Sequence, residues 1–151
     1  MITSRKLEKF KNIKHGFFDR TGGKSSGIYK SLNCGFGSSD KKKNILKNIE
    51  IVCKEIGCSS KKLVLLHQIH SNKFIFINKK YNFKKKIKSD ASITNIKNIA
   101  LGVLTADCVP ILIYDKQLKM ISAIHAGWKG AYKGIVHKVV NFFLKKGSDK
   151  K

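Results

Sequence analysis

The sequence is poor in proline, arginine and acidic residues. Its 151 residues include one proline, and only Arg5 and Arg20 among its 32 basic residues are arginines. Aspartate and glutamate together number 9, which leaves a formal net charge of +23. The scarcity of proline and an apolar fraction of 42% exclude a disordered or proline-rich chain. We expect residues 1–151 to form one domain with its own hydrophobic core.

Long hydrophobic runs are also missing. Every apolar run is much shorter than the roughly 20 residues of a membrane-spanning helix, so we expect no membrane partner. The opening residues, MITSRKLEKF, lack the apolar segment of a secretion signal. The four cysteines form no CxxC pair. These features predict reduced thiols in a cytoplasmic protein.

The excess positive charge has two interpretations. Lysine is spread along the whole chain together with many Asn and Ile residues, which favours a compositional bias of the source genome. A dedicated nucleic-acid reader would usually add arginines and exposed aromatic residues. In either case we expect non-specific, salt-sensitive binding to polyanions.

Apolar periodicity predicts two helices. The first, at 40–56, has apolar residues at helical spacing and ends at Gly57. Its N-cap is expected among the preceding polar residues, Ser38, Ser39 and Asp40. The second helix is predicted at 129–145, with Tyr132 on its apolar stripe and His137 on its solvated face.

Short apolar runs predict strands. One is expected at 16–18, ahead of a Gly-rich loop. A second, at 63–69, and a third, at 73–77, are expected to form a hairpin around Ser71-Asn72. The lysine-rich segment 79–88 is predicted to be a solvated loop.

Residues 99–130 contain three apolar runs and carry the candidate chemistry. Cys108 follows the first run and His125 ends the third, while His70 ends the run at 63–69. Two imidazoles and a thiolate match the ligand preference of zinc, with a fourth position open, and Asp107 could orient a ligating histidine. An alternative without metal makes Cys108 a nucleophile and His125 its base. Cys108 as a small buried apolar side chain, with His125 as an ordinary loop residue, is also open.

The Gly-rich stretch HGFFDRTGGKSSGIYKSLNCGFG offers a possible anion site. Arg20 has a planar guanidinium suited to phosphate or carboxylate, and glycines allow the backbone to approach a ligand closely. The alternative is a purely structural loop with Arg20 on its surface.

Four segments resemble one known family in the family's order: the stretch from His15 quoted above, LLHQIHS, SDASITNIKNIALGVLTADCVPILIYD and SAIHAGWKGAYKGIV. The family is called multicopper polyphenol oxidase or laccase-like, and also purine nucleoside phosphorylase and peptidoglycan editing factor. The resemblance implies an α/β (α+β) fold with a sheet-rich core of packed mixed sheets flanked by helices. The resemblance implies this arrangement rather than a Rossmann fold, and the GxGxxG motif is absent. It also implies that His70, Cys108 and His125 bind one metal, zinc in preference to the copper of the older naming.

The resemblance further implies phosphorolysis of adenosine, inosine and methylthioadenosine, with adenosine deamination alongside. A metal-activated water could attack a purine carbon. Phosphate would then be bound by fixed positive charge and backbone N–H groups, for which the candidates are Arg20, Gly22, Gly23 and Lys129.

The chain departs from the family at several points. Lys129 stands where the family usually has arginine, and Asp19 replaces a small hydroxyl residue. The family's further segment with a Gly-Pro-Cys motif is missing, which predicts a C-terminally truncated domain with impaired activity. Two other functions are therefore kept: a metal-free Cys–His hydrolase that edits cell-wall precursors, and a basic binding module without catalysis.

Overall fold

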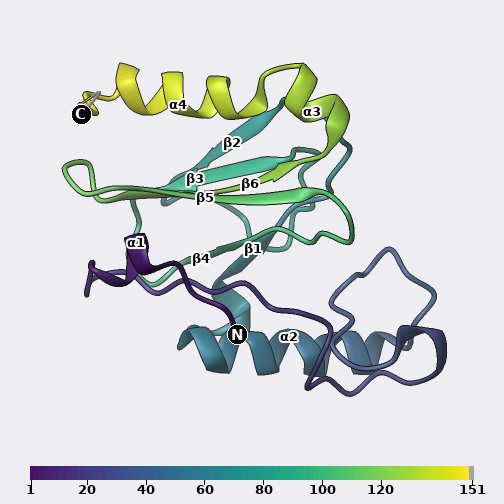
Figure 1. The fold of residues 1–151 in the computed structure, drawn as a ribbon. Coiled ribbons are helices and arrows are strands. Elements are labelled where there is room, and N and C mark those ends of the chain that lie inside the picture. Colours follow the sequence, from purple (N-terminus) through teal and green to yellow (C-terminus); the bar gives the residue numbers. More distant parts are fainter. Residues whose placement is uncertain (150–151) are drawn as a thin grey trace. The chain divides into compact units, whose positions relative to one another are not determined.

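The computed structural model describes residues 1–149. The chain divides into two compact units, Met1–Lys61 and Lys62–Lys151, which are described in turn (Figure 1). A short 3-10 helix, Ser60–Lys62, spans the boundary between them in the sequence. Among the described residues, no helix has the length and apolar character needed to cross a membrane.

The first unit is built on one long helix, α2 (Lys42–Ile56). Ile45, Ile49 and Cys53 are buried along one face of α2, as the apolar spacing predicts. The helix ends where Gly57 adopts a left-handed conformation with φ +74°. The expected N-cap is wrong, because Lys41 occupies the cap position and makes no side-chain cap bond.

Asp40 holds the preceding loop instead of capping α2. Its carboxylate accepts hydrogen bonds from Ser25 Oγ at 2.5 Å and Asn33 Nδ2 at 3.0 Å. The other regular elements of this unit are short: α1 (Arg5–Glu8) and a 3-10 helix (Gly27–Tyr29). The strand expected at 16–18 is reduced to an isolated bridge between Ile2 and Phe17.

The second unit contains two sheets. Their strands are β1 (Leu63–Leu65), β2 (Phe74–Ile77), β3 (Ala91–Thr94), β4 (Ala100–Gly102), β5 (Val109–Asp115) and β6 (Met120–Ala126). β1 and β4 form a parallel pair, and the other four strands form a mixed sheet in the order β2-β3-β6-β5. In that sheet β2 and β3 are parallel, while β6 is antiparallel to both β3 and β5.

The hairpin expected around Ser71-Asn72 is wrong. The first strand ends at Leu65 and pairs with β4, and β2 pairs with β3. The hairpin of this unit joins β5 to β6, where the Asp115 carboxylate accepts a hydrogen bond from the Leu118 N–H at 2.6 Å. Its register places Pro110 opposite His125.

The predicted second helix is broken into α3 (Trp128–Tyr132) and α4 (Ile135–Lys145) by Gly134, whose φ is +72°. Ile135, Val139 and Phe143 of α4 are buried against the four-stranded sheet, which α4 flanks in Figure 1. Tyr132 is 89% exposed, so its expected place in the apolar stripe is wrong. The arrangement confirms an α+β fold of mixed sheets flanked by helices.

Candidate metal centre

The second unit brings His70, Cys108 and His125 together. One ligand atom from each of the three side chains lies within 4.8 Å of the others. Cys108 Sγ is 3.8 Å from His70 Nε2, and the two imidazole rings meet edge to face with centroids 4.8 Å apart. Cys108 immediately precedes β5 and His125 lies near the end of β6, so the β5–β6 hairpin places this pair.

Strand alternation explains why His125 is buried but points away from α4. Its neighbours Ile124 and Ala126 belong to the core that packs on α4. Because successive side chains of a strand point to opposite faces, His125 lies on the other face of the sheet. It is 3% exposed, whereas His70 is exposed and Cys108 is half-buried. The site is therefore open on the side of His70.

Asp90 positions both histidines. Its buried carboxylate contacts His125 Nδ1 at 2.9 Å, which leaves Nε2 of that ring as the free ligand atom. The same carboxylate accepts hydrogen bonds from three successive backbone N–H groups, those of Ile69, His70 and Ser71. This wrapping requires the left-handed conformation of His70, whose φ is +56°.

The hydrogen bonds to Asp90 keep it ionised. Burial raises the pKa of Asp90, but donation from the Ser71 hydroxyl, His125 and two backbone N–H groups outweighs it, so the pKa lies below its ordinary value. A carboxylate hydrogen-bonded to a ligating imidazole fixes the ring orientation and raises the basicity of the ligand nitrogen. Asp107, expected in this position, is exposed on the loop before Cys108.

Gln68 joins the loop that carries Cys108 to the segment that carries His70. Its side-chain amide donates to the Leu104 carbonyl at 2.7 Å and accepts from the Leu104 N–H at 2.8 Å. Paired hydrogen bonds of this kind fix both distance and orientation. The distance between the His70 segment and the Cys108 loop is therefore fixed, although the two are far apart in the sequence.

Gly127 leaves room among the ligands. A Cβ atom at this position would lie 2.8 Å from His70 Cδ2 and 3.1 Å from Cys108 Sγ. Its φ of −70° is ordinary, so glycine is needed here for space and not for backbone freedom. Gly130 similarly lets α3 approach the backbone of Ser71, because a Cβ there would lie 2.7 Å from the Ser71 carbonyl oxygen.

The three side chains fit a zinc ion. Tetrahedral zinc with ordinary bond lengths separates a thiolate sulfur from an imidazole nitrogen by about 3.6 Å. The distance between Cys108 Sγ and His70 Nε2 is 3.8 Å. The oriented Nε2 of His125 and the space kept by Gly127 complete a cradle that would hold such an ion beside the exposed His70.

The proposed phosphate residues fall in both units. Lys129 is exposed in α3, with its Nζ 5.3 Å from the centre of the Trp128 ring. Arg20, in the first unit, is exposed and donates to the Lys30 carbonyl at 3.4 Å. Gly23 packs directly on the Ser31 backbone, where a Cβ would clash with the Ser31 carbonyl oxygen, and its N–H donates to Ser31 Oγ at 2.9 Å.

The remaining features of the Gly-rich loop concern its conformation. Gly22 is in a left-handed conformation with φ +80° and open space around it. The Asp19 carboxylate folds back on Thr21, accepting from its N–H at 2.8 Å and its hydroxyl at 2.6 Å.

Sequence reasoning missed Asp90, Gln68 and Gly127. All three lie inside the segments that carry the family resemblance, but a glutamine after a strand, a lone aspartate before one and a glycine after one have many ordinary explanations. Their roles depend on contacts with residues far away in the sequence.

The fold and the ligand set define an α+β protein with a candidate His–Cys–His metal centre. The chain belongs to the family described as multi-copper polyphenol oxidoreductase laccase, which matches residues 14–151. A Bacteroides thetaiotaomicron protein named purine nucleoside phosphorylase is 34% identical over 90% of this chain and 53% of its own length. A Corynebacterium glutamicum protein of that name is 36% identical over 85% of this chain and 52% of its own. The chain thus spans about half the length of these relatives.

Solved structures show the same fold. A Bacillus licheniformis hypothetical protein, YfiH, has a TM-score of 0.80 and 26% identity, and the likeness covers 85% of this chain and 51% of the other. A Neisseria meningitidis protein has a TM-score of 0.70 and 32% identity over 82% of this chain and 49% of its own.

Proposed function

We propose that this chain carries the zinc centre of a purine nucleoside phosphorylase. The observation that carries the proposal is the cluster of His70, Cys108 and His125, whose ligand atoms lie within 4.8 Å of one another. The names of the relatives support purine nucleosides and phosphate as substrates. Adenosine, inosine and methylthioadenosine are the proposed nucleosides, with adenosine deamination as an accompanying reaction.

Zinc is preferred over copper because of the ligands that surround the centre. Mononuclear copper sites with two histidines and a cysteine commonly add an axial methionine. Met120 is the only methionine of the second unit, and it lies at the opposite end of β6 from His125, in the core against α4. A thiolate ligand also favours a reducing compartment such as the cytoplasm.

The residues of the centre have separable roles in this proposal. His70 and Cys108 bind the metal from the open side, while Asp90 keeps Nε2 of His125 directed at it. Bound zinc would supply Lewis-acid chemistry and lower the pKa of a water in the open position. Arg20 and Lys129 would bind phosphate as fixed positive charges.

A metal-free hydrolase is the second candidate, and the contact between Cys108 and His70 favours it. The 3.8 Å from Sγ to Nε2 would allow His70 to take the thiol proton, a role that sequence reasoning assigned to His125. In this candidate the substrate would be an amide of a cell-wall precursor. Chelators should leave such an activity unchanged.

Metal content separates the two candidates. We expect about one zinc per chain in the wild type, loss of that zinc in Cys108→Ala, and retention in the control Cys34→Ala, whose thiol lies in the first unit. Inosine phosphorolysis should then depend on zinc and disappear with a chelator. A wild-type protein that binds no zinc when supplied with it would contradict the proposal, and chelator-resistant amidase activity would support the hydrolase.

A further inference from the structure

Residues 79–88 concentrate positive charge beyond the general lysine content of the chain. Six of these ten residues are lysines, against 32 basic residues in the whole sequence of 151. An overall compositional bias does not explain such local density. None of these lysines takes part in the candidate metal centre, so the segment needs an explanation of its own.

The segment is an ordered platform. Asn78 and Asn82 each accept a hydrogen bond from the backbone N–H two residues later, at 2.9 Å, and so build two successive turns. Tyr81 and Ile87 pack against the apolar cluster of Val64, Leu66 and Ile77. These contacts fix the turns to the rest of the unit. Phe83 meets the Tyr81 ring edge to face and remains 40% exposed. Proteins that bind single-stranded nucleic acid commonly combine exposed aromatic rings, on which bases stack, with surrounding positive charge.

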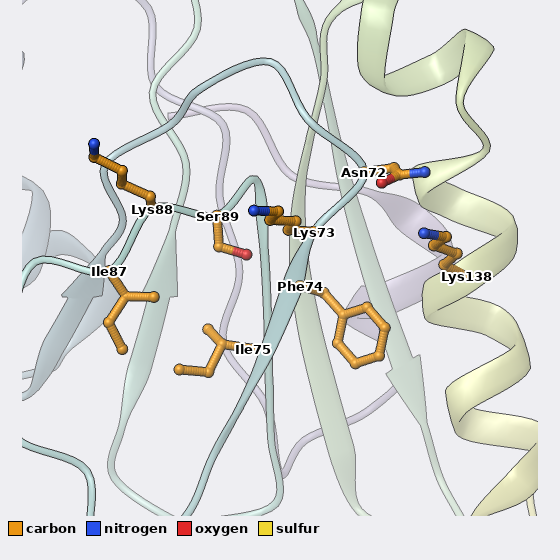
Figure 2. Close-up of a pocket in the computed structure, with 8 residues that line it drawn as sticks. All are labelled: Asn72, Lys73, Phe74, Ile75, Ile87, Lys88, Ser89 and Lys138. Carbon is orange, nitrogen blue, oxygen red and sulfur yellow. The ribbon is translucent and has the colours of Figure 1, made fainter.

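The platform leads directly into a groove beside the edge strand β2, which we call the β2 groove. It has a volume of about 400 Å³ and is lined by Asn72, Lys73, Phe74, Ile75, Ile87, Lys88, Ser89 and Lys138. Figure 2 shows Ile75 and Ile87 on one side of β2. Phe74 points to the other side, toward α4, the helix that carries Lys138. A second hollow shares Phe74 and Lys138 and extends along α4 to Lys145. The surface is therefore elongated, with a half-buried apolar floor and exposed cationic rims.

The shape and charge of this surface select an extended polyanion. A small ligand needs a pocket that encloses most of its surface, whereas Lys73, Lys88 and Lys138 are all exposed around an open groove. Lys73 directly precedes β2 and places a positive charge beside this edge strand, which disfavours a peptide added to β2 as a further strand. Neither arginine of the chain lies in this unit, so the side chain that most often reads base edges in a duplex is missing.

We propose that residues 79–88 and the β2 groove bind single-stranded nucleic acid, with lysines on the phosphates and Phe83 stacked on a base. This function is independent of the metal centre. Binding should be insensitive to sequence and should weaken steeply as salt rises, since each phosphate contact releases a counterion.

The test is fluorescence anisotropy with labelled oligo-dT and oligo-U of about 15 nucleotides, and with a duplex of the same length. One variant combines Lys84→Ala, Lys85→Ala and Lys88→Ala. The matched control, Lys42→Ala with Lys43→Ala and Lys47→Ala, removes the same charge from the exposed face of α2. We expect the first variant to bind single strands at least about tenfold more weakly at about 100 mM salt, with a salt slope smaller by about 2. The control should bind within about twofold of the wild type.

Phe83 tests the stacking contact separately. Phe83→Ala should weaken single-strand binding by about fivefold or more, whereas Phe83→Tyr should preserve it. Stronger binding of oligo-dT or oligo-U than of the duplex would support the proposal and identify the preferred backbone. Equal losses in the two triple-lysine variants, equal binding of the duplex, or displacement by polyglutamate as effective as by an unlabelled single strand would each overturn it.

Discussion

Two residues that carry no proposed ligand atom, Gly127 and Asp90, determine what the candidate centre can hold. Gly127 keeps the space between His70 and Cys108 empty, and Asp90 directs the His125 ring while holding the backbone around His70. Side chains that orient ligands in this way commonly change metal affinity by about 10- to 100-fold when they are replaced. Both roles can be tested with single substitutions.

Gly127→Ala should lower zinc affinity by at least about tenfold, because its Cβ would lie 2.8 Å from His70 Cδ2 and force that ring away. Competition with a chromophoric chelator measures this affinity. Gly37→Ala is the control, because a Cβ there has open space around it. Unchanged affinity in Gly127→Ala would show that the ligands do not gather around this glycine.

Asp90→Asn should reduce the free energy of unfolding by about 3 kcal/mol, because an amide cannot accept all the hydrogen bonds that the buried carboxylate receives. Urea denaturation measures the loss. Asp107→Asn is the matched control and should change stability by less than about 0.5 kcal/mol, since Asp107 is exposed. Equal effects of the two substitutions would contradict the role given to Asp90.

The helix α2 organises the Gly-rich loop through one buried side chain. Asn48 accepts from the Lys24 N–H at 2.7 Å and donates to the carbonyls of Ser31 and Asn33 and to Ser25 Oγ. Apolar periodicity predicts the helix but not this role, since Asn48 looks like an ordinary polar residue. An isolated helix in water would leave the Asn48 side chain hydrated, so only the packed loop gives it these partners.

Asn48→Ala should destabilise the protein by about 2–3 kcal/mol, because several buried loop groups would lose their partners. Hydrogen exchange should accelerate at the Lys24 amide, which donates to Asn48. Lys47→Ala, on the exposed side of the same helix, should change stability by less than about 0.5 kcal/mol. Slow exchange at Lys24 in the Asn48 variant would show that the loop is held by other contacts.

Strand pairing shows where local patterns stop being informative. The spacing of the apolar runs at 63–69 and 73–77 suggests a hairpin, but β1 pairs with β4 and β2 pairs with β3. Both are parallel pairs, whose partners are joined by long connections that leave no turn signal. The β5–β6 hairpin is different, because a short polar turn at 115–119 directly joins its two apolar runs and is visible in the sequence.

The residues proposed for phosphate and for the metal are not confined to one compact unit. The proposed metal ligands belong to Lys62–Lys151, whereas Arg20 belongs to Met1–Lys61. Lys129, the other proposed phosphate residue with a charged side chain, belongs to Lys62–Lys151. In the proposed reaction the contributions of Arg20 and of the metal ligands should separate in kinetics.

Arg20→Ala should raise the KM for phosphate by about tenfold or more, since it removes a charge-assisted contact to the anion, and should leave the zinc content unchanged. Initial rates at varied phosphate concentration provide the measurement. The other arginine of the chain offers a control of equal charge, Arg5→Ala, which should keep the wild-type KM. An unchanged KM in Arg20→Ala would remove Arg20 from the phosphate site.

Local sequence patterns predict most of the regular elements, and the resemblance of four segments identifies the family. Apolar spacing and ligand chemistry are local properties that make His70, Cys108 and His125 candidates, and the family resemblance is what joins them in one predicted site. The folded chain is needed to show that Asp90 orients His125, that Gln68 joins the two loops, and that Gly127 lies among the ligands. The first two contacts join residues 35 and 36 positions apart. Contacts of that kind arise from strand pairing and packing, which no local pattern encodes.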